Sequence, residues 1–210
     1  MIPRLEDLPA EPRRIIWHWT GGGAEANATD LSRYMYVVGQ SGRIYQGVPV
    51  AANMRRIPRG TPLSEYAAHA GGFNSYSVGV ALAGMVDAVP GGPYGPHPIT
   101  QDQLRVATGL VARMVTEWAL PVNVNTVLTH WEVYHVHRIG TPGKWDITEL
   151  PWATDLIPEQ VGALIREQCR RAVFDPTAYL PALRPLRHAP ARLRPLPEST
   201  RTPRRHPDDE

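Results

Sequence analysis

The chain has 210 residues, with 22 Lys and Arg residues against 20 Asp and Glu residues, a formal net charge of +2 and a hydrophobic fraction of 42%. This balance excludes a wholly disordered chain and a strongly basic nucleic-acid-binding protein. Residues 1–14 are rich in charged side chains and nowhere do about 18 apolar residues run together, so we expect neither a secretory signal nor a membrane span. The single cysteine excludes an intramolecular disulfide, and we expect synthesis in the cytoplasm.

The composition predicts one domain, residues 1–175, followed by a tail, residues 176–210. The tail holds eight prolines and seven arginines. This composition is typical of a disordered segment, apart from a short docked piece that we expect near Tyr179 and Leu180. A binding module that recruits an anionic polymer through the tail is one hypothesis, although the interleaved prolines and the acidic C-terminus argue against nucleic acid.

In the first half of the chain the pattern predicts strands. Arg14–Trp19 is a short apolar run that ends in three glycines, which indicates a buried strand that leads into a loop. Tyr34–Val38 and Arg43–Gln46 flank a four-residue segment with a glycine at each end, which is typical of a β-hairpin. Ser77–Leu82 predicts another central strand, and segment 86–98, rich in proline and glycine, predicts a loop.

The second half predicts two helices and one more strand. Thr100 and Gln103 have capping-box spacing at the start of a helix, and Thr126–Thr129 is a brief strand. A last helix begins near Pro158 and places Cys169 on its apolar face, as a packed residue and not a nucleophile. Because strands and helices alternate, we expect an α/β fold with a mixed central sheet flanked by helices.

Two histidines stand at the ends of predicted strands. His18 and His130 are more than a hundred residues apart, and neighbouring strands of one sheet would bring them together. Asp146 and Lys144 follow in a turn-rich loop, and two histidines with one aspartate leave a tetrahedral zinc ion with one open position. On these residues alone, the alternative interpretation is two unrelated core or rim histidines, and it is the favoured one.

Four motifs in this order resemble the zinc-dependent N-acetylmuramoyl-L-alanine amidases, a family that includes phage endolysins and the peptidoglycan recognition proteins. The first is the strand that ends in His18, and the second is the tyrosine-bearing hairpin that begins at Tyr34. The third and fourth are His69-Ala-Gly-Gly-Phe-Asn74 with Ser-Val-Gly-Val from Ser77, and Thr129-His130 with Lys144-Trp-Asp146.

The resemblance implies a site residue by residue. It implies zinc ligands His18, His130 and Asp146, with Tyr34 and Lys144 as catalytic residues. It also implies a cleft wall that binds substrate through His69, Asn74 and Trp19.

The sequence departs from the family pattern in three places, one of which is Ile147, where a proline usually follows the third ligand. Some of these amidases carry a glutamate base where this chain has Ala81, so proton handling falls to Tyr34, or to Glu132 if that side chain turns inward. Residues 134–139 look like an inserted loop, and His135 with His137 is a rival zinc pair if the two lie on a strand.

The resemblance implies hydrolysis of the amide bond between the lactyl group of N-acetylmuramic acid and L-alanine in peptidoglycan, in a monomeric enzyme that acts on the cell wall. A phage or prophage lysin is the expected setting, and a bacterial recycling enzyme is the alternative. A protein of the same fold that binds peptidoglycan without cleaving it is the second hypothesis for the function.

Overall fold

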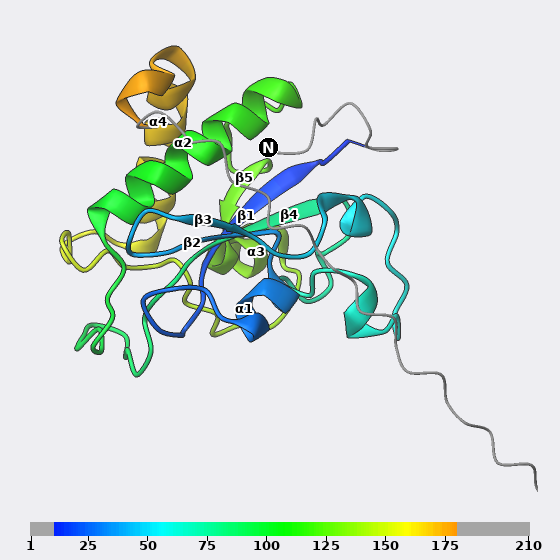
Figure 1. The fold of residues 1–210 in the computed structure, drawn as a ribbon, viewed down its shortest axis with the longest axis horizontal. Helices are drawn as coiled ribbons and strands as arrows, with labels where there is room; N and C mark the ends of the chain where they lie inside the picture. The colour runs from blue at the N-terminus through cyan, green and yellow to red at the C-terminus, as the bar shows by residue number, and fades with distance from the viewer. Residues whose placement is uncertain (1–10, 180–210) are drawn as a thin grey trace, which may run out of the picture. The chain divides into compact units, whose positions relative to one another are not determined.

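The computed structural model describes residues 11–179 (Figure 1). Its centre is a five-stranded sheet with the strand order β3-β2-β4-β1-β5. Strands β2, β4, β1 and β5 run parallel, and β3 pairs antiparallel with β2 at the edge, so the predicted mixed sheet is confirmed. The strand bounds are β1 Arg14–Trp19, β2 Tyr36–Val38, β3 Ile44–Gln46, β4 Ser77–Leu82 and β5 Val127–Thr129.

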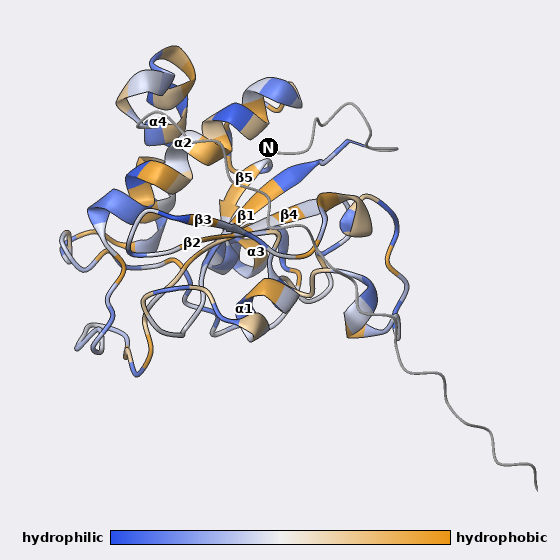
Figure 2. Cartoon of the chain, in the orientation of Figure 1, coloured by the Kyte–Doolittle hydropathy of each residue, from blue (hydrophilic) through white to orange (hydrophobic). Residues whose placement is uncertain are grey.

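Two long helices, α2 (Gln101–Glu117) and α4 (Pro158–Phe174), cover one face of the sheet (Figure 1). Each has an apolar stripe toward the strands and a polar outer face, as the hydropathy colouring in Figure 2 shows for α2. The N-cap of α2 is Thr100, which forms the predicted capping box with Gln103. Cys169 of α4 is fully buried, and burial raises the pKa of its thiol to about 12, so it is the packed residue that we predicted.

The opposite face of the sheet carries the buried side chain of His18. Along β1, Ile15, Trp17 and Trp19 belong to the core under α2 and α4, and Ile16 packs with Val133 of α3 (His130–His137). Because side chains alternate along a strand, His18 shares the face of Ile16. Helices α3 and α1 (Ala28–Arg33) lie on that side.

The segment that we predicted as an inserted loop is a helix instead. Thr129 caps α3 and forms a capping box with Glu132, and the helix continues to His137. Arg138 then ends it in the left-handed conformation, with φ 58°. The prediction of a loop is wrong for residues 134–137 because the Thr129–Glu132 capping box stabilises the start of a helix that is too short for its apolar pattern to indicate one.

The residues that directly follow the predicted domain boundary at residue 175 pack against the domain. The short 3-10 helix η4 (Pro176–Ala178) packs against α4 and α2, and Arg105 Nη1 donates to the carbonyl of Tyr179 at 3.3 Å. The rest of the predicted tail, from Leu180, lies outside the described residues. Two further 3-10 helices are η2 (Val50–Asn53) and η3 (Leu63–Glu65). Within residues 11–179, no helix combines the length and apolarity needed to cross a membrane.

Candidate metal centre

His18 is held rigidly near the end of the central strand β1. It pairs in register with Ala81 of β4, and its side chain is fully buried. A strand with neighbours on both sides fixes its backbone, so the imidazole has little freedom to leave its position.

His130 is the first residue of α3, directly after β5. Thr129 is both the last residue of β5 and the N-cap of the helix, with its hydroxyl on the amide of Glu132. Since β5 lies beside β1, this turn brings His130 next to His18, and the two ring centroids are 4.6 Å apart. The structure therefore brings together the two histidines that the sequence places at strand ends.

Asp146 completes the cluster. Its Oδ2 lies 2.8 Å from His18 Nδ1 and 3.0 Å from His130 Nδ1. The amide of Trp131 donates to the backbone carbonyl of Asp146 at 2.9 Å, which ties the 140–146 loop to the start of α3. Among residues 11–179, these three are the one group whose ligand atoms all lie close enough to hold a metal ion, within 4.8 Å of one another.

The electrostatics of the cluster match those of metal ligands. Burial lowers the pKa of His18 to about 4, although the hydrogen bond with Asp146 opposes this. Burial acts to raise the pKa of Asp146, but hydrogen bonds with His130 and His18 outweigh it and leave the pKa at about 2. At neutral pH His18 is therefore neutral and Asp146 ionised, which are the forms that bind metals.

The donor set fits zinc. Two imidazole nitrogens and one carboxylate oxygen are ligands that zinc accepts, and three protein ligands leave a fourth position for water or substrate. His18, His130 and Asp146 can thus hold a metal ion between them.

His69 contacts the cluster from behind. Its Nδ1 lies 3.1 Å from His18 Nε2, and its ring lies so close to Gly79 of β4 that a Cβ there would be 2.7 Å from the imidazole. Asn74 shapes this segment, because its Oδ1 accepts from the backbone amides of His69 and Ala70. The contact with His18 could not be read from the sequence, since it depends on how closely the segment approaches β4.

The two predicted catalytic residues flank the cluster. The Tyr34 ring centroid lies 5.1 Å from that of His18, and burial together with the charge of Asp146 raises the pKa of the Tyr34 phenol. Lys144 is exposed at the mouth of the metal-site hollow, which we define by Trp19, Tyr34, His69, His130, Lys144 and Asp146 with their neighbours. The positive charge of Lys144 also contributes to the lowered pKa of His18.

Glu132 is not free to act as the base that we considered. The residue is 2% exposed. Its carboxylate forms a bidentate ion pair with Arg166 of α4, whose Nη1 and Nη2 donate to Oε2 at 2.8 Å and to Oε1 at 2.9 Å. Its Oε2 also accepts from the amide of Thr129. The side chain does turn inward, but toward α4, so the hypothesis that it handles protons at the site is wrong.

The rival pair of histidines lies outside the cluster. His135 and His137 are on a helix, where residues two apart do not share a face. The His135 ring stacks on Trp131 with centroids 3.8 Å apart, and the His137 ring lies 5.1 Å from that of Phe73. The two side chains therefore have separate structural surroundings.

Comparisons with known proteins relate the chain to a family and to solved structures. Residues 8–146 match the family model described as N-acetylmuramoyl-L-alanine amidase. The Staphylococcus aureus hydrolase AmiA, solved in complex with its ligand, is 13% identical to this chain and has a TM-score of 0.50. The match covers 79% of this chain and 78% of AmiA, and this likeness shows the fold alone. No curated protein sequence matches the chain.

Two further solved structures are similar at lower TM-scores. The endolysin of the Thermus scotoductus bacteriophage Ph2119 is 15% identical and has a TM-score of 0.43. The match covers 76% of this chain and 86% of the endolysin. The N-acetylmuramoyl-L-alanine amidase LysC from Clostridium intestinale is 17% identical and has a TM-score of 0.40. The match covers 74% of this chain and 86% of LysC. Because the family model spans well over half of the sequence, this chain belongs to the N-acetylmuramoyl-L-alanine amidase family.

Proposed function

We propose that this protein is a zinc-dependent hydrolase that cleaves the amide bond between the lactyl group of N-acetylmuramic acid and L-alanine in peptidoglycan. The observation that carries the proposal is the convergence of His18 Nδ1 and His130 Nδ1 on Asp146 Oδ2, in a chain of this family. A phage or prophage lysin, the setting that the sequence predicts, stays a prediction.

The amide bond sets the chemical requirements. It is resonance-stabilised, so hydrolysis at neutral pH needs an activated nucleophile and a stabilised oxyanion. When bound, zinc supplies both, because it lowers the pKa of a water ligand to about 7 and polarises a carbonyl. His18, His130 and Asp146 are the residues that would hold it.

Lys144 and Tyr34 supply the remaining groups in this proposal. The Lys144 ammonium lies at the same hollow as the ligands and would stabilise the negative charge that develops on the carbonyl oxygen. The raised pKa of Tyr34 keeps its phenol protonated at neutral pH, so it can orient the water or pass a proton to the departing alanine nitrogen.

The deciding experiment is digestion of purified peptidoglycan with the zinc-loaded protein, with and without a chelator. We expect new alanine amino termini, no new sugar reducing ends, and loss of the reaction with the chelator. New reducing ends would indicate a glycosidase and contradict the proposal. Binding to sacculi with no release of amino termini would favour a peptidoglycan-binding protein that cleaves nothing.

The ligand assignment is tested by metal content. His18→Ala, His130→Ala and Asp146→Ala should each lose most of the zinc, because each removes one of three ligands. His135→Ala is the matched control, a histidine on the same helix as His130 but outside the cluster. If His135→Ala with His137→Ala removes the metal while Asp146→Ala keeps it, the proposed ligand set is wrong.

A further inference from the structure

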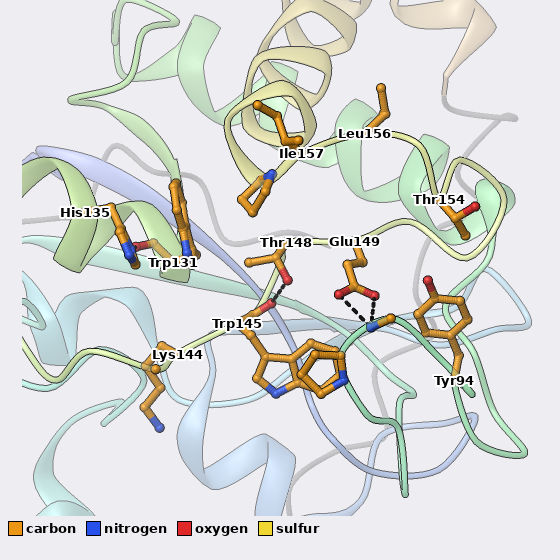
Figure 3. Close-up of a pocket in the computed structure, with 14 residues that line it drawn as sticks. Tyr94, Trp131, His135, Lys144, Trp145, Thr148, Glu149, Thr154, Leu156 and Ile157 are labelled. Carbon is orange, nitrogen blue, oxygen red and sulfur yellow. Dashed lines mark hydrogen bonds between the residues drawn. The ribbon is translucent and has the colours of Figure 1, made fainter.

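A second hollow lies beside the metal-site hollow, with a volume of about 580 Å³ (Figure 3). Its walls carry the aromatic rings of Tyr94, Trp131 and Trp145, and Leu156 and Ile157 line it as well. We call it the aromatic hollow. Ile157 is 56% exposed, so part of its apolar surface is open to solvent at the hollow. The volume is within the range of small-molecule sites.

The aromatic hollow is fixed relative to the proposed metal ligands. Trp131 directly follows His130, and Trp145 directly precedes Asp146. The hydrogen bond from the amide of Trp131 to the carbonyl of Asp146 holds these two segments together. Lys144 lines both hollows, so the two adjoin at this residue.

The chemistry of the walls suits an uncharged saccharide. Trp131 and His135 both line the hollow and stack on each other with their planes 12° apart, and flat amphipathic rings suit the apolar C–H faces of a sugar. Glu149 lies in the same hollow and its carboxylate oxygens accept from the amide of Gly91 at 3.0 Å, which fixes an acceptor for sugar hydroxyl or acetamido N–H groups. Lys144 at the rim opposes a cationic occupant.

A third hollow, which shares His69, His130 and Lys144 with the metal-site hollow, has a different charge. It is lined by Arg59, Tyr134, His130 and Lys144, and no carboxylate is among the described residues that line it. The substrate of the proposed reaction is asymmetric in the same sense, since the peptide beyond the scissile amide carries carboxylates and the amidated muramyl saccharide carries no charge. The carboxylate of Glu149 would repel the peptide and accept hydrogen bonds from the saccharide.

We propose that the aromatic hollow is the saccharide subsite of this protein, so that Trp131, Tyr94 and Glu149 fix the direction in which the glycan strand leaves the metal site. This inference rests on the proposed function, because it assumes an amide with a saccharide on one side. It assigns to these residues a role in selecting substrates that carry the sugar.

The kinetic test compares a disaccharide-tripeptide with the lactoyl-tripeptide that lacks the sugars. In Trp131→Leu and Tyr94→Leu, kcat/KM for the disaccharide-tripeptide should fall by about tenfold or more relative to kcat/KM for the lactoyl-tripeptide, mainly through a higher KM. Trp152→Leu is the control, a half-buried tryptophan from the same loop region that lines a separate hollow beside α2, and it should leave the ratio unchanged. A ratio that stays constant in Trp131→Leu and Tyr94→Leu would overturn the proposal.

A binding measurement separates this inference from the proposed function. The probe is the amidated N-acetylglucosaminyl-N-acetylmuramyl disaccharide, titrated by NMR into the full-length protein. We expect binding by the wild type, and about tenfold weaker binding by Trp131→Leu, even if no hydrolysis is found. Acetylation of the free amine of the tripeptide removes its ammonium charge. If this change in the substrate lowers kcat/KM as much as Trp131→Leu does, the occupant of the aromatic hollow is an ammonium group and the saccharide assignment is wrong.

Discussion

The buried rings of His18 and His69 meet edge to face, with His18 Nε2 3.1 Å from His69 Nδ1 and an angle of 83° between the planes. His18 presents its other nitrogen, Nδ1, to Asp146. If Nδ1 of His18 were to hold a metal, its Nε2–H would donate a hydrogen bond to His69 Nδ1, which would fix the tautomer and the orientation of the His18 ring. His69, which we expected to bind substrate, is thus placed to position a metal ligand, while it also lines the metal-site hollow.

We predict that His69→Ala weakens zinc binding by roughly 10- to 100-fold, the usual cost of losing such a partner. His69→Gln should recover part of the affinity, because its amide oxygen can accept from His18. Competition with a chelator measures the affinity, and the visible spectrum of the cobalt-loaded protein reports the ligand geometry. His135→Ala is the matched control. Unchanged affinity and an unchanged cobalt spectrum in His69→Ala would refute this role.

The Glu132–Arg166 ion pair gives a prediction about stability. It lies between α3 and α4, and Arg166 also donates to the carbonyl of Val127 at 3.1 Å. Glu132→Ala leaves a buried guanidinium without its partner, so the free energy of unfolding should fall by about 3 to 5 kcal/mol. The double variant Glu132→Leu with Arg166→Met should recover much of this loss. Urea unfolding measures both, and a double variant no more stable than Glu132→Ala would contradict the account.

Acid should destabilise the metal-free protein through His18. Burial lowers the pKa of its folded form to about 4, whereas the unfolded chain titrates near its ordinary value of about 6.5. Below that value the unfolded chain binds a proton that the folded chain does not, so the contribution is complete above pH 6.5 or so and is lost as the pH falls toward 4. The contribution of Asp146, whose pKa is lowered to about 2, is lost only at still lower pH.

The size of the His18 effect follows from the shift. Over the whole window the loss approaches about 3 kcal/mol. Urea unfolding of the chelator-treated wild type and of His18→Gln, at a series of pH values between about 7 and 4.5, measures it. The wild type should lose stability more steeply than His18→Gln. Parallel pH profiles would show that His18 does not carry this dependence.

The clustering of His18 and His130 could be predicted because strand patterns and strand ends are local. The apolar run of β1 and the short β5 both end beside a histidine, and parallel neighbours place such ends at one edge of the sheet. Asp146 was a candidate because it supplies a carboxylate in the turn-rich loop after His130, and the resemblance to the family implied it as the third ligand. The secondary structure around them was predicted less well, because α1 has only six residues and its capping box, Asn27 with Asp30, precedes no apolar periodicity.

Contacts that depend on close tertiary approach were beyond the sequence. The sequence allows Glu132 to turn inward but does not identify its partner, Arg166, which lies 34 residues away on another helix. That approach needs Gly162, since a Cβ there would lie 2.4 Å from Glu132 Oε1. Likewise the His69 ring lies against Gly79 because no side chain intervenes. In both cases a glycine permits the contact, and a glycine in a sequence does not show what will occupy the space beside it.

Lys144 separates an enzyme from a protein that only holds zinc and peptidoglycan. Its ammonium lies at the metal-site hollow and is solvent-exposed, so Lys144→Ala should leave the fold and the zinc content nearly unchanged. If the charge stabilises the oxyanion only in the transition state, kcat should fall by roughly 10²-fold or more with little change in substrate affinity. Lys144→Arg should restore little, because a planar guanidinium is not a compact point charge. Turnover and binding of a soluble muropeptide at saturating zinc measure these quantities. A loss confined to affinity would make Lys144 a clamp for a substrate carboxylate, and an unchanged kcat would remove it from the proposed mechanism.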